Sequence, residues 1–246
     1  MVRAIDKEIG YTKMKPYHKI LAVDSCTEIC SVALLSDQQY WAQVQDAPRD
    51  HSKNLLPMID EVLDQAGIKL DDIDAFALTR GPGSFTGVRI GTSIVQGLAF
   101  GADKPVIEVS SLATMAQRQI HQHPEVKDIF CAIDARMGEV YFAHYTQKQG
   151  IARLVGEESV VAPEILLTKG VESNNLTAIV GTGFVTYPEL KSMVQKQNLI
   201  ESDIDYPVAE DMMTLAVDLF AQSQLKSAMD VQPIYLRNTV AWKKST

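Results

Sequence analysis

ILAVDSCTEICSVALL, residues 20–35 of the chain, consists of two apolar runs separated by a short polar segment. A short apolar run that is bounded by turn-forming residues is typical of a buried strand. The first run ends at Asp24 and the second begins at Cys30. The stretch therefore predicts a hairpin that carries an acidic residue at its bend.

A second segment, FCAIDARMGEVYFAHY at residues 130–145, aligns with the first without gaps at an offset of 110 residues. Ala22, Asp24 and Ala33 in the first copy are matched by Ala132, Asp134 and Ala143 in the second. Each copy predicts a buried strand, an aspartate and a return strand. Self-similarity at a fixed offset indicates a duplicated unit, and the helices and strands that follow each copy make the predicted fold class α/β with two related lobes.

The segments after the first hairpin predict two helices and a strand. Residues 51–67 place apolar side chains at helical spacing and end at a glycine. Residues 73–83 form a short buried strand that runs into a loop, and residues 87–101 form a helix with many small residues. After the second hairpin, residues 163–171, 176–184 and 187–197 are helix-like or strand-like.

The expected organisation comprises two lobes, an N-terminal leader, a C-terminal tail and a late helix that joins the first lobe. It consists of a leader at 1–19 without regular structure, an N-terminal lobe at 20–107 that is joined by a helix at 209–225, a second, smaller lobe at 108–208, and an extended C-terminal tail at 226–246. Met14 lies inside the leader and offers an alternative start of translation, so residues 1–13 are not assumed to be native.

Composition indicates a folded protein and argues against several classes of function. The chain has 246 residues, of which 46% are hydrophobic and 22% charged, close to globular averages. A net charge of −8 argues against a broad basic surface for nucleic acid, although Arg237, Lys243 and Lys244 form a basic cluster near the end. Three cysteines without paired spacing favour neither a disulfide framework nor a zinc site. No segment resembles a signal peptide or a membrane span, so we expect a cytoplasmic protein without membrane attachment.

The glycine-rich stretch GPGSFTGVRIG, residues 81–91, does not match a phosphate-binding motif. A P-loop has the order G-x-x-x-x-G-K-[ST], and no register of this stretch supplies the lysine. The dinucleotide fingerprint G-x-G-x-x-G fails as well, because its sixth position is Thr86. The glycines therefore need another explanation.

Four glycines on the helix after this loop form two pairs, each one helical turn apart: Gly87 with Gly91, and Gly97 with Gly101. A glycine costs a helix roughly 1 kcal/mol relative to alanine. Four of them therefore indicate that another backbone approaches closely. That backbone belongs either to the sheet of the same lobe or to a partner subunit, and we favour the partner.

Two lobes that each open with an acidic hairpin resemble the actin, sugar-kinase and Hsp70 superfamily, whose hairpins cradle nucleotide phosphates on either side of a cleft. A closer resemblance, over residues 20–244, is to the bacterial TsaB (YeaZ) family of tRNA threonylcarbamoyladenosine biosynthesis proteins. It rests on the strings ILAVDSCTE.CSVALL, HS..LLP.I...L, GPGSFTGVRIG, AIDARMGEVY and YLRN.VAWKK. The resemblance implies two duplicated actin-like (ribonuclease-H-like) lobes. It also implies a non-catalytic partner of TsaD, the enzyme that transfers a threonylcarbamoyl group onto the adenosine beside the tRNA anticodon.

The same resemblance implies a set of partners. They are a TsaD-type enzyme in a heterodimer, a TsaE-type ATPase that completes the assembly, and a second copy of the chain when TsaD is absent, held through helices of the N-terminal half. Contact with tRNA would be indirect. The residues expected at the partner interface are Leu55, Ile59, Val62, Gly87, Gly91 and Val95.

The superfamily resemblance raises the question of nucleotide binding, because Asp24 and Asp134 would place a magnesium ion or a water molecule between the lobes. The turn after Asp24 lacks glycine and carries Glu28, whose charge would repel phosphate. We therefore favour a structural role for both aspartates. The candidate nucleotide-binding residues are Asp24, Thr27, Arg136, Gly181 and Gly183, of which the two glycines are equally well explained by a strand-to-helix turn. No cofactor is expected to bind tightly, and ATP or ADP with Mg would lie at the interface of the complex.

The sequence does not supply the metal ligands of a TsaD-like enzyme, which holds its metal with H-x-x-x-H. His51 is followed four residues later by Leu55, so we interpret His51 as the first residue of a helix. His121 and His123 lie in a loop-like segment without a carboxylate. We expect no metal site.

We also expect no catalytic residue. The chain would then be an accessory subunit and not an enzyme. The alternative is an ATPase or phosphotransferase of the actin-like superfamily that uses Asp24 and Asp134. A peptidase is the least favoured function, because Ser84 lies in G-P-G-S-F-T-G and not in the nucleophile motif G-x-S-x-G.

Overall fold

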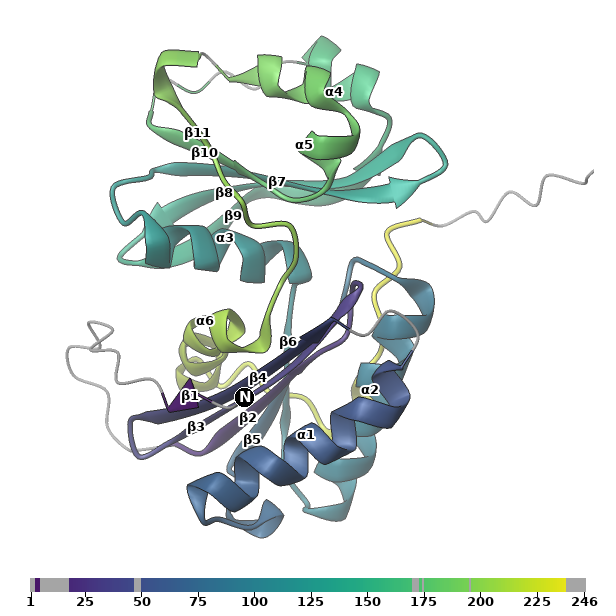
Figure 1. Cartoon of the computed structure of the whole chain (residues 1–246), viewed down its shortest axis with the longest axis vertical. Coiled ribbons are helices and arrows are strands. Elements are labelled where there is room, and N and C mark those ends of the chain that lie inside the picture. Colours follow the sequence, from purple (N-terminus) through teal and green to yellow (C-terminus); the bar gives the residue numbers. More distant parts are fainter. Residues whose placement is uncertain are drawn as a thin grey trace, which may run out of the picture.

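The computed structural model describes residues 3–4, 18–46, 50–169, 173, 175–194 and 196–237. Most of the expected leader at 1–19, and the tail beyond residue 237 with Lys243 and Lys244, lie outside the described residues. The chain forms two lobes, each built on one sheet (Figure 1).

The first sheet begins with the predicted hairpin. Strands β2 and β3 pair antiparallel, with Asp24 opposite Ser31, and all five residues of β2 are buried. The spatial order is β1-β4-β3-β2-β5-β6, in which β5 and β6 run parallel to β2. The strands are β1 (Arg3–Ala4), β2 (Ile20–Asp24), β3 (Ile29–Ser36), β4 (Gln39–Asp46), β5 (Ala75–Thr79) and β6 (Val106–Val109).

The second sheet repeats the arrangement of the first. Its order is β11-β10-β7-β8-β9, so an antiparallel meander of β7, β8 and β9 is again extended by two parallel strands on the side of the first strand. The strands are β7 (Asp128–Arg136), β8 (Glu139–Lys148), β9 (Ile151–Val161), β10 (Thr177–Val180) and β11 (Leu199–Glu201). The predicted duplication of an α/β lobe is confirmed.

Helices separate and cover the two sheets (Figure 1). Helices α1 and α2 cover the outer face of the first sheet, α4 and α5 cover the outer face of the second, and α3 and α6 lie between the sheets. The helices are α1 (His51–Ala66), α2 (Phe85–Gly101), α3 (Ser111–Gln122), α4 (Pro163–Lys169), α5 (Gly183–Thr186) and α6 (Ala209–Ala221). Short 3-10 helices are η1 (Leu70–Asp72), η2 (Pro188–Met193), η3 (Lys196–Asn198) and η4 (Ala228–Asp230).

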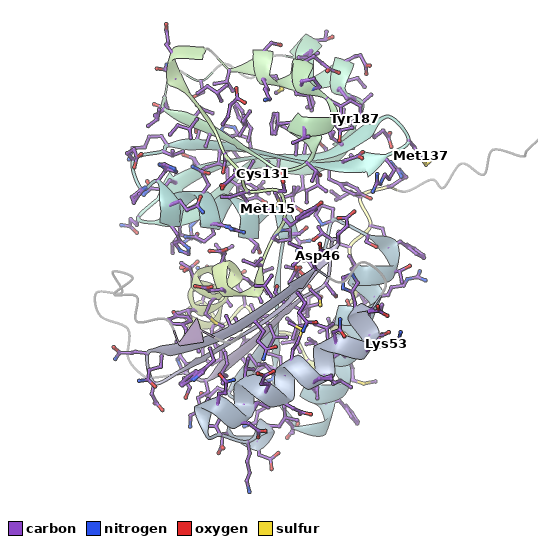
Figure 2. All side chains as sticks on the ribbon, in the orientation of Figure 1. Asp46, Lys53, Met115, Cys131, Met137 and Tyr187 are labelled. Atoms are coloured by element: carbon purple, nitrogen blue, oxygen red, sulfur yellow. The ribbon has the colours of Figure 1, made fainter. Side chains whose placement is uncertain are left out.

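The largest apolar cluster lies in the middle layer and belongs to both lobes. It joins buried side chains of β2 and β5 to those of α3, α6 and β7, among them Leu112, Met115, Cys131 and Met212. Figure 2 labels Met115 and Cys131 in the region where α3 meets the second sheet. Because α6 packs on β2, β3, β5 and β6, this late segment of the chain completes the first lobe.

Several boundaries differ from the predicted ones. Helix α2 begins at Phe85, two residues before the expected start, because Ser84 caps it by accepting a hydrogen bond from the Gly87 N–H. Strand β6 continues to Val109, past the expected lobe boundary at 107. Residues 188–193 form a 3-10 helix where a helix-like segment was expected.

Candidate functional site

The turns of the two duplicated hairpins lie opposite each other across the junction of the lobes. Arg136, at the end of β7, extends to Glu28 in the first turn with a distance of 3.4 Å between Nη2 and Oε1. The same guanidinium lies 3.4 Å from Asp134. The Arg136 side chain is 75% exposed, so each pair contributes little to stability.

Asp24 is fully buried at the end of β2. Its Oδ1 accepts hydrogen bonds from the Cys26 N–H (3.3 Å) and from the Thr79 hydroxyl, whereas its Oδ2 has no partner within the part of the chain that the structure describes. Burial raises the pKa of Asp24 to about 7, although these hydrogen bonds oppose the change. A carboxyl group that is enclosed and half protonated near neutral pH is poorly suited to hold a cation in an open cleft. The placement favours the structural role.

The turn after Asp24 is covered by the loop and helix that contain GPGSFTGVRIG. The Ser84 N–H donates to the Cys26 carbonyl oxygen at 2.7 Å, and the Ser25 hydroxyl donates to the Gly87 carbonyl oxygen at 2.9 Å. A Cβ atom on Gly87 would lie 2.1 Å from the Ser25 carbonyl oxygen, and one on Gly91 would lie 2.5 Å from the Ser25 Oγ. The groups that approach these two glycines are therefore the carbonyl oxygen and the hydroxyl of Ser25 in the chain's own first hairpin, and a contact of Gly87 or Gly91 with a partner stays a prediction.

Thr27 and the second-lobe glycines are also enclosed by the chain. Thr27 is 5% exposed. A Cβ atom on Gly181 would lie 2.2 Å from the Ala132 carbonyl oxygen, and one on Gly183 would lie 2.7 Å from the Ala132 Cβ. Close packing of α5 against β7 thus explains both glycines, and of the five candidate nucleotide-binding residues it is Arg136 that has a largely exposed side chain.

The other residues expected at a partner interface are buried as well. Leu55, Ile59, Val62 and Val95 have at most 1% of their surface exposed and belong to the apolar cluster beneath α1 and α2. The apolar stripe of a helix that covers a sheet faces that sheet. In this structure the four side chains pack inside their own lobe, and their contact with a partner stays a prediction.

The opposite side of the same two helices carries exposed apolar side chains where α1 and α2 meet, and the sequence analysis did not identify them. Leu56 and Phe85 are 46% and 56% exposed. They belong to the wall of a groove of about 440 Å³ between α1 and α2, which is lined by Ser52, Leu56, Phe85, Thr86, Arg89, Ile90, Ser93 and Ile94. On the same side of α2, Gly97 is exposed and its missing side chain would meet nothing within 4 Å. The sequence contained a signal for this surface, because apolar residues lie outside the buried stripe of the helices. We call the surface formed by the groove residues and Gly97 the α1–α2 face.

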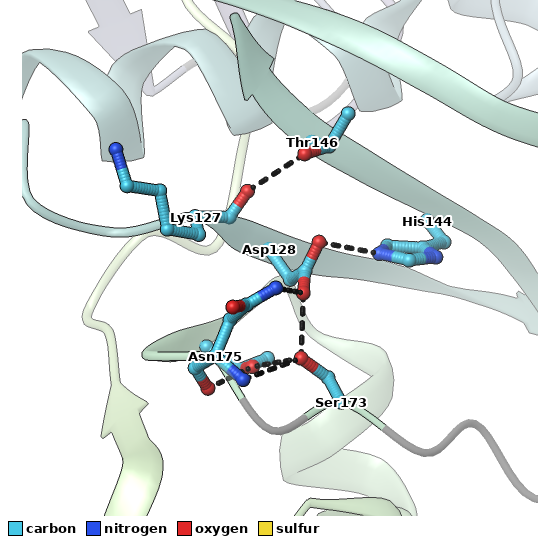
Figure 3. A network of polar contacts seen from close by, with 7 residues as sticks. Lys127, Asp128, His144, Thr146, Ser173 and Asn175 are labelled. Carbon is cyan, nitrogen blue, oxygen red and sulfur yellow. Dashed lines mark hydrogen bonds and ion pairs between the residues drawn. The ribbon is translucent and has the colours of Figure 1, made fainter.

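A polar cluster at the far end of the second sheet resembles a catalytic triad in composition but not in geometry (Figure 3). Asp128 accepts hydrogen bonds from the Ser173 hydroxyl (2.5 Å), the Asn175 side chain (2.9 Å) and His144 (3.1 Å). Burial raises the pKa of Asp128, but these hydrogen bonds together hold it below its ordinary value. The serine donates to the carboxylate and not to the histidine, so a base does not activate it. The cluster holds Ser173 and Asn175 against Asp128 of β7.

The histidines of the second lobe have structural partners. His121 lies in the last turn of α3, and not in a loop as expected, with its Nδ1 3.3 Å from Asp211 of α6. The segment is thus not without a carboxylate, and this expectation is corrected. His51 is the first residue of α1, as predicted. Among the described residues, no group of three or more His, Cys, Asp or Glu side chains is arranged to hold a metal ion.

The helices that the structure describes differ from membrane spans in length or in polarity. In the part of the chain that the structure covers, none has both the length and the apolar character of a membrane span.

Comparisons with known proteins place the chain among relatives of TsaD. The family model for TsaD, tRNA N6-adenosine threonylcarbamoyltransferase, matches residues 41–241. The chain is similar to the tRNA threonylcarbamoyladenosine biosynthesis protein TsaB of Escherichia coli (strain K12), with 43% identity over 92% of this chain and 97% of that protein. The TsaB of Haemophilus influenzae is likewise 43% identical, over 92% of this chain and 96% of that protein. The solved structure of YeaZ from Pseudomonas aeruginosa matches with a TM-score of 0.81 and 40% identity, over 89% of this chain and all of that one.

Proposed function

The chain belongs to the TsaB family of tRNA threonylcarbamoyladenosine biosynthesis proteins, and from this premise we propose that it is a non-catalytic partner of a TsaD-type enzyme. In this role it supports the threonylcarbamoylation of the adenosine next to the tRNA anticodon without doing the chemistry. A TsaE-type ATPase is the third component, and a homodimer forms when the chain is alone. The proposal places the protein in the cytoplasm, where the tRNA would be modified.

The observation that carries the proposal is the α1–α2 face. A groove with apolar walls and a guanidinium at its edge has the composition of a protein interface, in which aromatic residues and arginine are enriched. Gly97 leaves one position on this side of α2 without a side chain, so a helix of a partner can approach closely there. The face therefore suits a partner that presents helices of its own.

The junction of the lobes supports the non-catalytic part of the proposal. A phosphotransferase needs an accessible carboxylate at the reacting phosphate. Asp24 is enclosed, and its turn is covered by α2. If ATP or ADP with Mg takes part, it would lie at the interface with the partner, where the partner supplies the missing groups. The ATPase alternative predicts turnover by the purified chain that is lost in Asp24→Asn.

The proposal is tested by mixing the purified chain with its cognate TsaD-type enzyme and measuring mass by light scattering and affinity by calorimetry. We expect a heterodimer. Leu56→Asp should weaken it by about 1–3 kcal/mol, roughly tenfold to a hundredfold in Kd, because it places a charge in the groove. Leu154→Asp is the matched control, since Leu154 is 44% exposed on the edge strand β9 of the other lobe. The absence of a heterocomplex at all concentrations and nucleotides tested would overturn the proposal.

A further inference from the structure

The C-terminal strap, residues 231–237, connects the α1–α2 side of the first lobe to the second lobe. Its first residue is held by α2, because the Gln96 side chain donates to the Val231 carbonyl oxygen at 2.9 Å. Its middle is held by the loop after β5, where the Ile234 N–H donates to the Arg80 carbonyl oxygen at 3.0 Å. Its last residue, Arg237, reaches the β7–β8 turn. The strap therefore has a fixed position across both lobes.

Arg237 is the connection to the second lobe. Its Nε donates to Glu139 at 3.0 Å, and its Nη2 donates to the carbonyl oxygens of Ala135 (3.2 Å) and Arg136 (3.3 Å). Its Nη1 lies 3.7 Å from the sulfur of Met137. Met137 is at the tip of the turn, with 65% of its surface exposed. Figure 2 shows it at the outer end of the β7–β8 hairpin.

Aromatic and arginine side chains continue from the strap onto the α1–α2 face. Arg89 donates through Nε to the Tyr235 hydroxyl at 2.7 Å and stacks on Phe85, with Cζ 3.7 Å from the ring centroid. The rings of Phe85 and Tyr235 lie 5.5 Å apart. Phe85 is itself part of the groove wall. Contacts therefore lead from the groove to Tyr235, and two residues further along the strap Arg237 contacts Met137.

This series of residues has the composition of a protein interface. Phe85, Tyr235 and Met137 are 56%, 41% and 65% exposed, which is costly for large apolar side chains that remain in water. Aromatic residues, methionine and arginine are the types that interfaces enrich. Because the contacts among them hold their side chains in place, little conformational entropy would be lost on binding.

We infer that the docking face for the TsaD-type partner is not confined to α1 and α2 but continues along the C-terminal strap to Met137, so that the partner contacts both lobes. The inference rests on the proposed function and specifies which surface the partner covers. A protein fits this surface better than RNA does. Arg237 is paired with Glu139 and Arg136 with Glu28 and Asp134, so little positive charge is left for phosphate on a chain of net charge −8.

The test compares Kd values of single variants of the full chain with the cognate TsaD-type enzyme. Met137→Asp should weaken binding about tenfold, and aspartate tolerates the positive φ of this position better than most residues do. Tyr235→Phe should weaken it less, because it removes the hydrogen bond to Arg89 and keeps the ring. Leu154 pairs with Tyr145, toward the end of β8 that is remote from Met137. Leu154→Asp should therefore bind as the unchanged chain does. Thermal unfolding of each variant alone shows whether the fold is retained.

The outcomes separate this inference from the proposed function. If Leu56→Asp weakens binding and Met137→Asp does not, the partner contacts only the first lobe, and the inference is overturned while the proposed function stands. If Met137→Asp weakens self-association or tRNA retention but not partner binding, the surface belongs to a second copy or to RNA, and the inference is overturned again. If the unchanged chain does not bind the enzyme, both fail.

Discussion

Asp24 shows how a residue that is acidic in sequence can be a neutral side chain in the fold. Its carboxyl group closes the turn of the first hairpin by accepting from Cys26 and Thr79, and water does not reach it. A carboxyl group with a raised pKa is stabilised in its protonated form. Its contribution to stability is therefore present below its unfolded pKa, near 4, and is lost as the pH rises through about 7.

We predict that the unfolding free energy of Asp24→Asn increases, relative to that of the unchanged chain, as the pH rises from about 4 to 7. Asparagine keeps an acceptor for Cys26 and Thr79 without acquiring a charge. At pH 7 the gain in unfolding free energy should approach a few kcal/mol. Each unit by which the pKa differs between the folded and the unfolded state corresponds to about 1.4 kcal/mol. Urea unfolding of both proteins at several pH values measures it. A difference in unfolding free energy that does not vary with pH would contradict the prediction.

Helix α2 is packed on one side and open on the other, and its glycines mark both sides. Gly87 and Gly91 lie against the first hairpin, whereas Gly97 and Gly101 meet nothing within 4 Å. The sequence showed that four helical glycines need an explanation. It did not show that the explanation differs between the two pairs, because spacing along one helix does not reveal what packs against it.

We predict opposite effects of alanine at these two kinds of position. Gly87→Ala should destabilise the fold by roughly 2 kcal/mol or more, because its Cβ would overlap the backbone of Ser25. Gly97→Ala should stabilise it by up to about 1 kcal/mol, since alanine is the better helix former. Both are measured by chemical unfolding at low protein concentration, where self-association is weak. Equal effects of the two substitutions would show that the assigned contacts are wrong.

Among the strands, burial decided which ones the sequence predicted most clearly. Strands β2 and β7 are almost fully buried and gave continuous apolar runs. Strand β9 has four exposed residues in a row at a sheet edge, and β4 is exposed at most positions beyond Val44, so neither showed a period that indicates a strand. The candidate site was predicted from the buried stripes of α1 and α2, because a stripe is the stronger signal. The groove on their other side became visible only when the helices were placed side by side.

At the scale of the whole molecule, α6 joins the lobes. Asp218 forms two hydrogen bonds with Arg153 of β9, at 2.7 and 3.2 Å. Asp211 lies 3.3 Å from His121 and 3.7 Å from Arg118, both on α3. These pairs, together with the shared apolar core, oppose the hinge motion by which two-lobed proteins close over a ligand. A fixed relation between the lobes suits a protein whose docking face includes both.

We predict that Arg153→Met loosens the junction of the lobes, because it keeps the apolar stem and removes the pair with Asp218. Amide hydrogen exchange should become faster in α6 and in β9 around residue 153. Lys191→Met is the control, since it removes an exposed ion pair with Glu201 inside the second lobe. Exchange rates in α6 that respond equally to both substitutions, or to neither, would contradict the prediction.

The position of α6 also has a consequence for how the protein is made. The inner face of the first sheet remains uncovered until residues 209–221 have left the ribosome, although its central strands are synthesised among the first hundred residues. The first residue of α6, Ala209, donates its backbone N–H to the hydroxyl of Ser31 in the first hairpin at 2.8 Å. The nascent first lobe therefore exposes an apolar surface until synthesis has passed residue 221. A chaperone that covers a bare sheet would meet this chain during that interval.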